Sequence, residues 1–267
     1  MKKNLILALL MVSAMGLSAQ VYVGFGFGYH MATQDRDLGT STNKSGDEKN
    51  IYGSMGQGIV PALKFGYMFN DYWGFEMGMS YLMGSELTVY EDYNPGAYDS
   101  YAEVIKTKST MIRFAPQLVF KTDMGIYSRI GIVIPVGGKT MAYRTVDVEF
   151  MGTTSKTVVD IENHGAFATG FTGAFGYGYE LNDNLTVFGE MEYIGLRFYN
   201  KTATVTKYEV DGTDKLGDLK TIQKETVYVD EVKTTDNQNV DEALKALKST
   251  SPYSAFGINI GIIYHIN

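Results

Sequence analysis

Eight segments of the chain alternate between large apolar residues and small or polar residues. In the stretch LKFGYMFNDYWGFEMGMSY at 63–81, Phe65 and Tyr67 alternate with Lys64 and Gly66 before a short Asn-Asp turn. A period of two places successive side chains on opposite faces of a β-strand, so the pattern predicts an all-β protein. The eight segments lie at 21–30, 59–69, 73–83, 110–121, 125–136, 165–181, 185–193 and 254–267.

The connections between these segments alternate strictly between short and long. Three are short and polar, at 70–72, 122–124 and 182–184, and four are long, at 31–58, 84–108, 138–163 and 197–252. Membrane barrels have short turns at one end and long loops at the other, whereas a soluble sandwich has no reason to alternate in this way. The chain is therefore predicted to form an eight-stranded antiparallel up-and-down transmembrane β-barrel with long extracellular loops.

The two faces of the strands differ in a way that suits a barrel in lipid. One face is almost continuously apolar, and the other holds Gly, Ala, Ser and Thr with occasional charges. A closed barrel satisfies its own backbone hydrogen bonds, so the apolar face is expected to meet lipid and the small residues to fill a narrow lumen. Pro61 and Pro116 lie within strands on the apolar face, and each is expected at a rim or a bulge. An aromatic girdle is expected near the short turns, from Tyr67, Phe69, Tyr72, Trp73, Tyr177, Tyr179 and Tyr264.

The N-terminal residues predict export. Lys2 and Lys3 precede an apolar run at 5–12 and small residues up to Ala19, which is the order of a signal peptide at 1–19. The run is too short to anchor a helix in a bilayer. A single domain at 20–267 would remain. The formal net charge of −7 argues against a nucleic-acid partner, and the chain has no cysteine to form a disulfide.

With these features the chain resembles the small OmpA/OmpX-type outer-membrane β-barrel family, over the barrel domain only. The resemblance implies a porin-like fold and a multi-pass location in the outer membrane of a Gram-negative cell. It also implies contact with outer-membrane lipid, with lipopolysaccharide and with the outer-membrane assembly machinery. The final strand keeps the alternation through Tyr264 and Ile266, but the chain ends at Asn267 rather than at the aromatic residue usual in the family.

Eight charged residues fall on the predicted inward face: Lys64, Glu76, Arg113, Lys121, Arg129, Glu180, Glu190 and Glu192. A charge in a narrow lumen must be paired, because an unpaired buried charge is very costly. The four cations and four anions therefore predict a salt-bridge network that closes the lumen. The alternative is an ion path gated by the same pairs. Counted from the short turns, three layers are expected: Lys121 with Glu180, then Lys64, Glu76, Arg129 and Glu190, then Arg113 with Glu192.

Catalysis is the weaker alternative. Enzymes on such barrels, for example those that modify lipid A, place a histidine beside a serine or an acid near the outer rim. His30 and His164 fall near the outer ends of their strands and Ser80 points inward, but no spacing links them; His265 lies at the opposite end. No catalytic residue is predicted, and the protein is expected not to be an enzyme.

No metal or cofactor site is predicted either. The carboxylate clusters DRD at 35–37 and DNQNVDE at 236–242 lack the glycine and glutamate spacing of a calcium loop. The glycine-rich GFGFGYH at 24–30 is followed by no helix, so it does not fit a phosphate-binding loop.

The long connection at 197–252 is the best candidate for a specific function. It holds two β-rich runs at 203–210 and 225–232, and a stretch at 239–249 that predicts a short helix capped by Asn239. This helix would bury Ala243, Leu244 and Leu247, as a lid over the barrel or as part of a ligand surface. The predicted function is a structural or surface-interaction role through the extracellular loops, including a ligand or protein bound by 197–252. The alternatives are an outer-membrane enzyme and a pore for small solutes or ions.

Overall fold

Eight strands form a closed circuit of antiparallel pairs in the computed structural model, which describes residues 20–33, 37–234, 236–237 and 239–266. They are β1 (Gln20–Ala32), β4 (Gly58–Met68), β5 (Trp73–Gly84), β7 (Ser100–Lys121), β8 (Ile126–Phe150), β10 (Gly170–Asn182), β11 (Leu185–Gly195) and β17 (Ala255–Ile266). Each strand pairs with the next in this order, and β17 pairs with β1. We call this circuit the ring. The predicted signal peptide lies outside the described residues.

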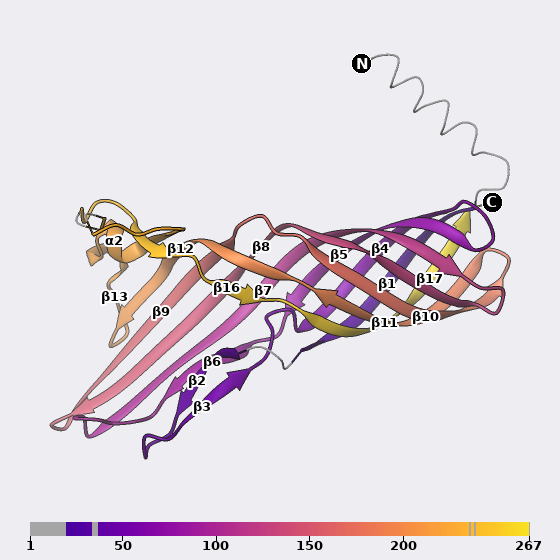
Figure 1. The fold of residues 1–267 in the computed structure, drawn as a ribbon. Coiled ribbons are helices and arrows are strands. Elements are labelled where there is room, and N and C mark those ends of the chain that lie inside the picture. The colour runs from indigo at the N-terminus through magenta and orange to yellow at the C-terminus, as the bar shows by residue number, and fades with distance from the viewer. Residues whose placement is uncertain (1–19, 34–36, 235, 238, 267) are drawn as a thin grey trace, which may run out of the picture.

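Tight turns close one end of the ring, as predicted. The side-chain oxygen of Asn70 accepts hydrogen bonds from the backbone N–H groups of Tyr72 and Trp73, which fixes the turn between β4 and β5. Gly125, with φ of 83°, supplies the left-handed residue in the turn between β7 and β8. The first residues of β1 pair with the last residues of β17, so both ends of the ring's chain lie at this short-turn end (Figure 1).

The apolar face of the ring points outward. Phe25 and Phe27 on β1 are about half exposed, as are Ile258 and Ile260 on β17. On the neighbouring strand β4, Val60, Lys64 and Met68 point inward and are buried. Among the described residues, no helix is long and apolar enough to cross a membrane.

Pro61 and Pro116 interrupt hydrogen-bond ladders without shifting the register. The β4–β5 pairs skip Val60 and Pro61, and the β7–β8 pairs skip Ala115 and Pro116, because proline has no N–H to donate. The expectation of a bulge at these prolines is therefore wrong. The bulge in β7–β8 lies between Ile112 and Arg113, opposite Val136.

Strands continue well beyond the ring, where the sequence predicts long loops at 84–108 and 138–163. β7 is 22 residues long and β8 is 25, and β8 returns as β9 (Thr153–Gly165). These extensions carry mixed polar and β-branched residues on both faces. They therefore lack the one-sided apolar pattern that reveals the ring strands. The prediction that these segments are loops is wrong.

The extensions belong to a sheet that projects from the ring. Its strand order is β3-β2-β6-β7-β8-β9-β12-β14-β15, and the pairs β2–β6 and β14–β15 are parallel. We call it the projecting sheet (Figure 1). Its further strands are β2 (Asp37–Thr42), β3 (Glu48–Tyr52), β6 (Leu87–Asp92), β12 (Arg197–Val210), β14 (Glu225–Val229) and β15 (Leu244–Leu247), with the short β13 (Thr213–Asp214) and β16 (Thr250–Pro252) beside β12.

The segment 197–252 is mostly β. The two β-rich runs become β12 and β14, which confirms that part of the prediction. The helix predicted at 239–249 is wrong, because Leu244–Leu247 forms β15 on the edge of β14, and Asn239 bonds Glu242 and Asp241 in a turn. The helical turns lie earlier, at η1 (Leu216–Asp218) and α2 (Thr221–Lys224).

Glu103 on β7 joins neighbouring strands of the projecting sheet. Its buried carboxylate accepts hydrogen bonds from the Tyr101 hydroxyl and from Nε of Arg144 on β8, each at 2.6 Å. Burial alone would raise the pKa of Glu103, but the bonds from Tyr101 and Arg144 outweigh burial and hold the pKa below its ordinary value. The ion pair therefore stabilises the sheet fully above the unfolded-state pKa of about 4.3, and this stabilisation is lost as the pH falls through the lower folded-state pKa.

We predict that Glu103→Gln lowers amide-exchange protection of 100–106 and 143–148 by about tenfold at pH 6, because a bond to a charged group is worth roughly 1.5–3 kcal/mol. Protection in the variant should no longer fall as the pH drops below 4. Protection factors corrected for intrinsic exchange rates measure both effects. Asp147→Asn is the matched control, since Asp147 forms an exposed pair with Lys156. Equal effects from the two substitutions would contradict the role of Glu103.

Candidate functional site

The interior of the ring holds a compact group of ions. Lys64 on β4 lies 2.9 Å from Glu190 on β11, and Arg129 on β8 bridges Glu190 and Glu76 on β5. The hydroxyl of Tyr22 donates to Glu76 at 2.8 Å, and that of Tyr127 donates to Glu190 at 2.7 Å. We call these six residues the inner ion cluster. It brings together the four charged residues expected at mid-depth.

Glycines make room for this cluster. A Cβ atom at Gly66 would lie 1.9 Å from the ring of Tyr22, and one at Gly176 would lie 2.7 Å from both Tyr127 and Glu190. Lys64 also packs its Nζ 3.9 Å above the ring centre of Phe188. The small residues of the inward face are therefore the space in which the buried tyrosines and ions pack.

A second polar layer lies beside the inner ion cluster. The amide of Asn259 on β17 donates to Glu190 at 3.1 Å and to Glu192 at 3.0 Å, so it links the two carboxylates. Arg113, expected in the same layer as Glu192, donates from Nε to Ser80 at 3.2 Å. Its buried Nη2 has no hydrogen-bond partner among the described residues.

His30 belongs to this second layer rather than to the rim. Its fully buried ring places Nε2 at 3.3 Å from Oδ1 of Asn259 and at 3.6 Å from Glu192. The position of His30 on the glycine face of β1, in register with Gly257, is the sequence signal for an inward side chain.

The layer expected nearest the short turns, Lys121 with Glu180, lies at that end of the ring. Lys121 and Glu180 form an ion pair of 2.9 Å that is partly exposed, beside a cavity of about 350 Å³ that reaches Arg129 and Glu76. His265 also lines this cavity and bonds Thr186 at 3.1 Å.

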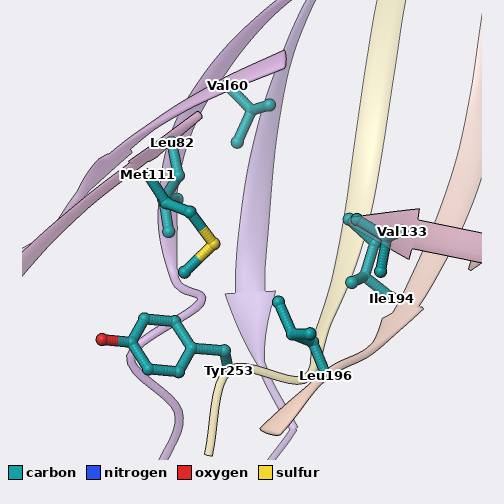
Figure 2. Close-up of a cluster of buried hydrophobic side chains, with 7 residues drawn as sticks. All are labelled: Val60, Leu82, Met111, Val133, Ile194, Leu196 and Tyr253. Atoms are coloured by element: carbon teal, nitrogen blue, oxygen red, sulfur yellow. The ribbon is translucent and has the colours of Figure 1, made fainter. Parts of the chain in front are cut away.

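An apolar cluster seals the interior toward the projecting sheet. It consists of Val60, Leu82, Met111, Val133, Ile194, Leu196 and Tyr253 (Figure 2). The sequence did not predict this cluster, because most residues of the inward face are small or polar. Its signal was present, since Val60 shares the parity of Lys64, and Leu82 that of Glu76. The hydroxyl of Tyr253 bonds Thr140 and Ser109.

The remaining histidine lies in the projecting sheet. His164 is half exposed, and its Nε2 lies 2.9 Å from Glu162, which also accepts a bond from Lys139. The bonds from Lys139 and His164 hold the pKa of Glu162 below its ordinary value. Ser80, the serine weighed as a nucleophile, accepts its bond from Arg113. No group of three or more metal-binding side chains lies within the described part of the chain.

Comparison with known families decides the class of protein. The model for the outer membrane protein beta-barrel domain matches residues 5–222. The chain belongs to the outer-membrane protein β-barrel family. This match confirms the resemblance to small outer-membrane barrels that the strand pattern carries.

Solved structures similar to this outer-membrane β-barrel protein share little sequence with it. OprG from Pseudomonas aeruginosa is 12% identical, with 94% of this chain and 97% of that chain covered and a TM-score of 0.44. Neisserial surface protein A is 10% identical, with 93% and 99% covered and a TM-score of 0.36. Ail of Yersinia pestis, in complex with the heparin analogue sucrose octasulfate, is 9% identical, with 94% and 100% covered and a TM-score of 0.37. No curated protein matches the sequence.

We predict that Glu190→Gln lowers the free energy of unfolding by about 3–5 kcal/mol, because it leaves the buried Lys64 and half of the Arg129 pairing without an anion. Urea unfolding in detergent micelles, followed by the mobility shift on unheated gels, measures this change. Glu180→Gln is the matched control at the exposed pair with Lys121, and should cost at most about 1 kcal/mol. Similar losses in both variants would argue against a cluster held by Glu190.

Proposed function

We propose that the ring spans the outer membrane of a Gram-negative cell as an eight-stranded up-and-down barrel. Its continuous exposed apolar face is the observation that carries this proposal, since a soluble protein does not leave so much apolar surface in water. A closed circuit of pairs also leaves no end strand with a whole unpaired edge to face lipid. Trp73, Tyr179 and Tyr264, each about half exposed near the short-turn end, fit the interfacial aromatic girdle.

The proposed membrane placement determines which compartment each part of the chain meets. The short turns lie in the periplasm and the projecting sheet lies outside the cell, after export directed by residues 1–19. The outward face contacts outer-membrane lipid and lipopolysaccharide, and insertion uses the outer-membrane assembly machinery. The domain at 20–267 carries the whole barrel.

We propose further that the barrel is closed and that its role is structural or surface interaction. The inner ion cluster and the apolar cluster obstruct the interior at two levels. Ions that are paired with one another offer no free charge to a permeating solute, and an apolar constriction excludes water. These two features favour a closed barrel over the pore alternative.

The projecting sheet supports the interaction role. Its far end carries an exposed aromatic group, in which Tyr98 stacks on Tyr101 at 5.9 Å and meets Phe150 at 6.0 Å. Exposed aromatic residues are the usual anchors of protein interfaces. A rigid sheet standing away from the membrane presents such residues to an extracellular ligand or protein.

The segment 197–252 can be shortened without breaking any pair of the ring. Asn200 and Ser249 are joined by a backbone bond of 3.0 Å and a side-chain bond of 2.8 Å. Residues 201–248 can therefore be replaced by an Asn-Gly turn between these two positions.

We predict that this excision lowers binding of the cell-displayed protein to a panel of extracellular-matrix proteins and glycans, because it removes β14 and β15 and most of β12 but keeps the aromatic group of Tyr98, Tyr101 and Phe150. The mobility shift on unheated gels should persist, which shows that the barrel remains folded. Unchanged binding by the shortened protein would refute a role for 197–252.

We predict that the wild-type protein gives no stepwise conductance in planar lipid bilayers. Glu190→Gln should be silent too, since the apolar cluster stays in place. Stepwise currents through the wild-type protein would overturn the closed barrel and favour the pore.

We propose that the protein is not an enzyme. His30 contacts Glu192 and Asn259 rather than a serine, in a layer closed by the apolar cluster. Mass spectra of lipid A from cells with wild-type protein and with His30→Gln test this, and a difference between them would favour the enzyme alternative.

A further inference from the structure

The ring has an open seam at the place where β8 changes its partner. The β8–β10 pairs end at Val133↔Gly170, and the β8–β9 pairs begin at Thr140↔Asn163. Between them, in the described chain, the edge of β8 at 134–139 has no strand partner on this side. The sequence there is Ile-Pro-Val-Gly-Gly-Lys, with the bulge at Val136 and no donor at Pro135. These features leave fewer backbone groups unpaired at the seam.

A cavity of about 580 Å³ opens at this seam. This volume lies within the range of sites that hold small molecules. Met111 and Phe198 line its inner part, and Val136 and Phe167, which are 56% and 80% exposed, lie at its mouth. The mouth is therefore apolar and continues the outward face of the ring.

Beside Met111 and Phe198, part of the inner wall of the cavity is polar but uncharged. The hydroxyls of Tyr253 and Thr140 line this part, and they bond each other and the hydroxyl of Ser109. Thr107 also lines the cavity, is only 5% exposed, and its hydroxyl has no hydrogen-bond partner among the described residues. A buried hydroxyl without a partner is unfavourable, so a ligand that bonds it would gain affinity.

The charges at the rim do not favour an anionic ligand. Lys139 and His164 both line the cavity, and both are bonded to Glu162. A carboxylate head group would have to compete with Glu162 for these cations. A neutral hydroxyl or carbonyl head would not.

We infer that this cavity binds an uncharged amphiphile, with one hydrocarbon chain or ring and a hydroxyl or carbonyl head, which enters sideways from the outer leaflet. The head meets the hydroxyls of Thr107, Thr140 and Tyr253, and the apolar part passes between Val136 and Phe167. The inference rests on the proposed membrane placement of the ring.

Photolabelling in lipid nanodiscs tests the site, with three diazirine-bearing probes of equal chain length: hexadecanol, hexadecanoic acid and hexadecane. Peptide mass spectrometry maps the labels. Hexadecanol should label the peptides around Thr107 and Val136 above the level of the general outward face around Ile260. The acid should label them about tenfold less, because its charge must be desolvated without a free cation.

Two substitutions separate binding from folding. Gly137 lines the cavity and a Cβ there meets nothing within 4 Å, so Gly137→Trp should obstruct the mouth of the cavity and abolish the excess labelling. Gly189→Trp is the matched control, because a Cβ there also meets nothing within 4 Å and Gly189 lies elsewhere on the outward face. Thr107→Val should reduce labelling by hexadecanol but not by hexadecane, and should not lower the unfolding midpoint, since it removes a hydroxyl without a partner.

Uniform labelling of the outward face, or excess labelling that survives Gly137→Trp, would overturn the site. Equal labelling by the acid would overturn the uncharged head group. If the outward face around Ile260 takes no label from any probe, the membrane placement itself fails, which is distinct from failure of the pocket.

Discussion

The pairing of β1 with β17 closes the ring, and the other properties of the molecule depend on this closure. The register runs from Val21↔Ile266 to Ala32↔Ala255 without a shift, so the first and last strands share a complete ladder. Without it, two strand edges would carry unpaired backbone groups, which lipid cannot satisfy. Closure also makes the interior narrow. Glycines therefore lie on the inward face beside the buried tyrosines and ions, as Gly66 does beside Tyr22.

The interior combines two solutions to the problem of filling a narrow space. At mid-depth, Glu76 and Glu190 neutralise Arg129 and Lys64. The hydroxyls of Tyr22 and Tyr127 donate further hydrogen bonds to these two carboxylates. A group of buried ions is weak evidence that the fold is stable. Removal of one member nevertheless destabilises the fold strongly, because it leaves a buried charge without a partner. Toward the projecting sheet, the apolar cluster fills the space with no electrostatic requirement.

The sequence predicts the ring well because the two faces of its strands differ strictly. On both sides of its turn, the stretch 63–81 alternates because one face points outward and the other faces the interior, and counting from the turn places Lys64 and Glu76 at the same depth. The sequence places Arg113 and Glu192 in one layer but does not show their partners: Asn259, Thr172 and His30 surround Glu192, and Ser80 accepts the bond from Arg113. Such choices depend on neighbours across the ring, which parity along one strand does not reveal.

The projecting sheet was missed for the opposite reason. With water on both faces, strands such as β9 need no apolar alternation, so their sequence resembles a loop. The helix expected at 239–249 failed similarly, because the apolar spacing at 243–247 suits a short strand beside β14 as well as a helix. Here the hydrogen bonds offered by an existing edge outweigh the helical preference of a few residues.

The edge of β15 shows how an open sheet can be kept from pairing further. Asn237 donates its side-chain amide to the carbonyl of Lys245 and accepts from its N–H, so it takes the place of a neighbouring strand at that residue. The seam in β8 is a second unpaired strand edge, and it lies within the ring. A strand that leaves a closed circuit to join an open sheet must give up one partner before it meets the next, and the backbone between them is unpaired. Pro135 lowers the number of donors left there, the bulge at Val136 turns the strand, and the space that results is large enough for a ligand.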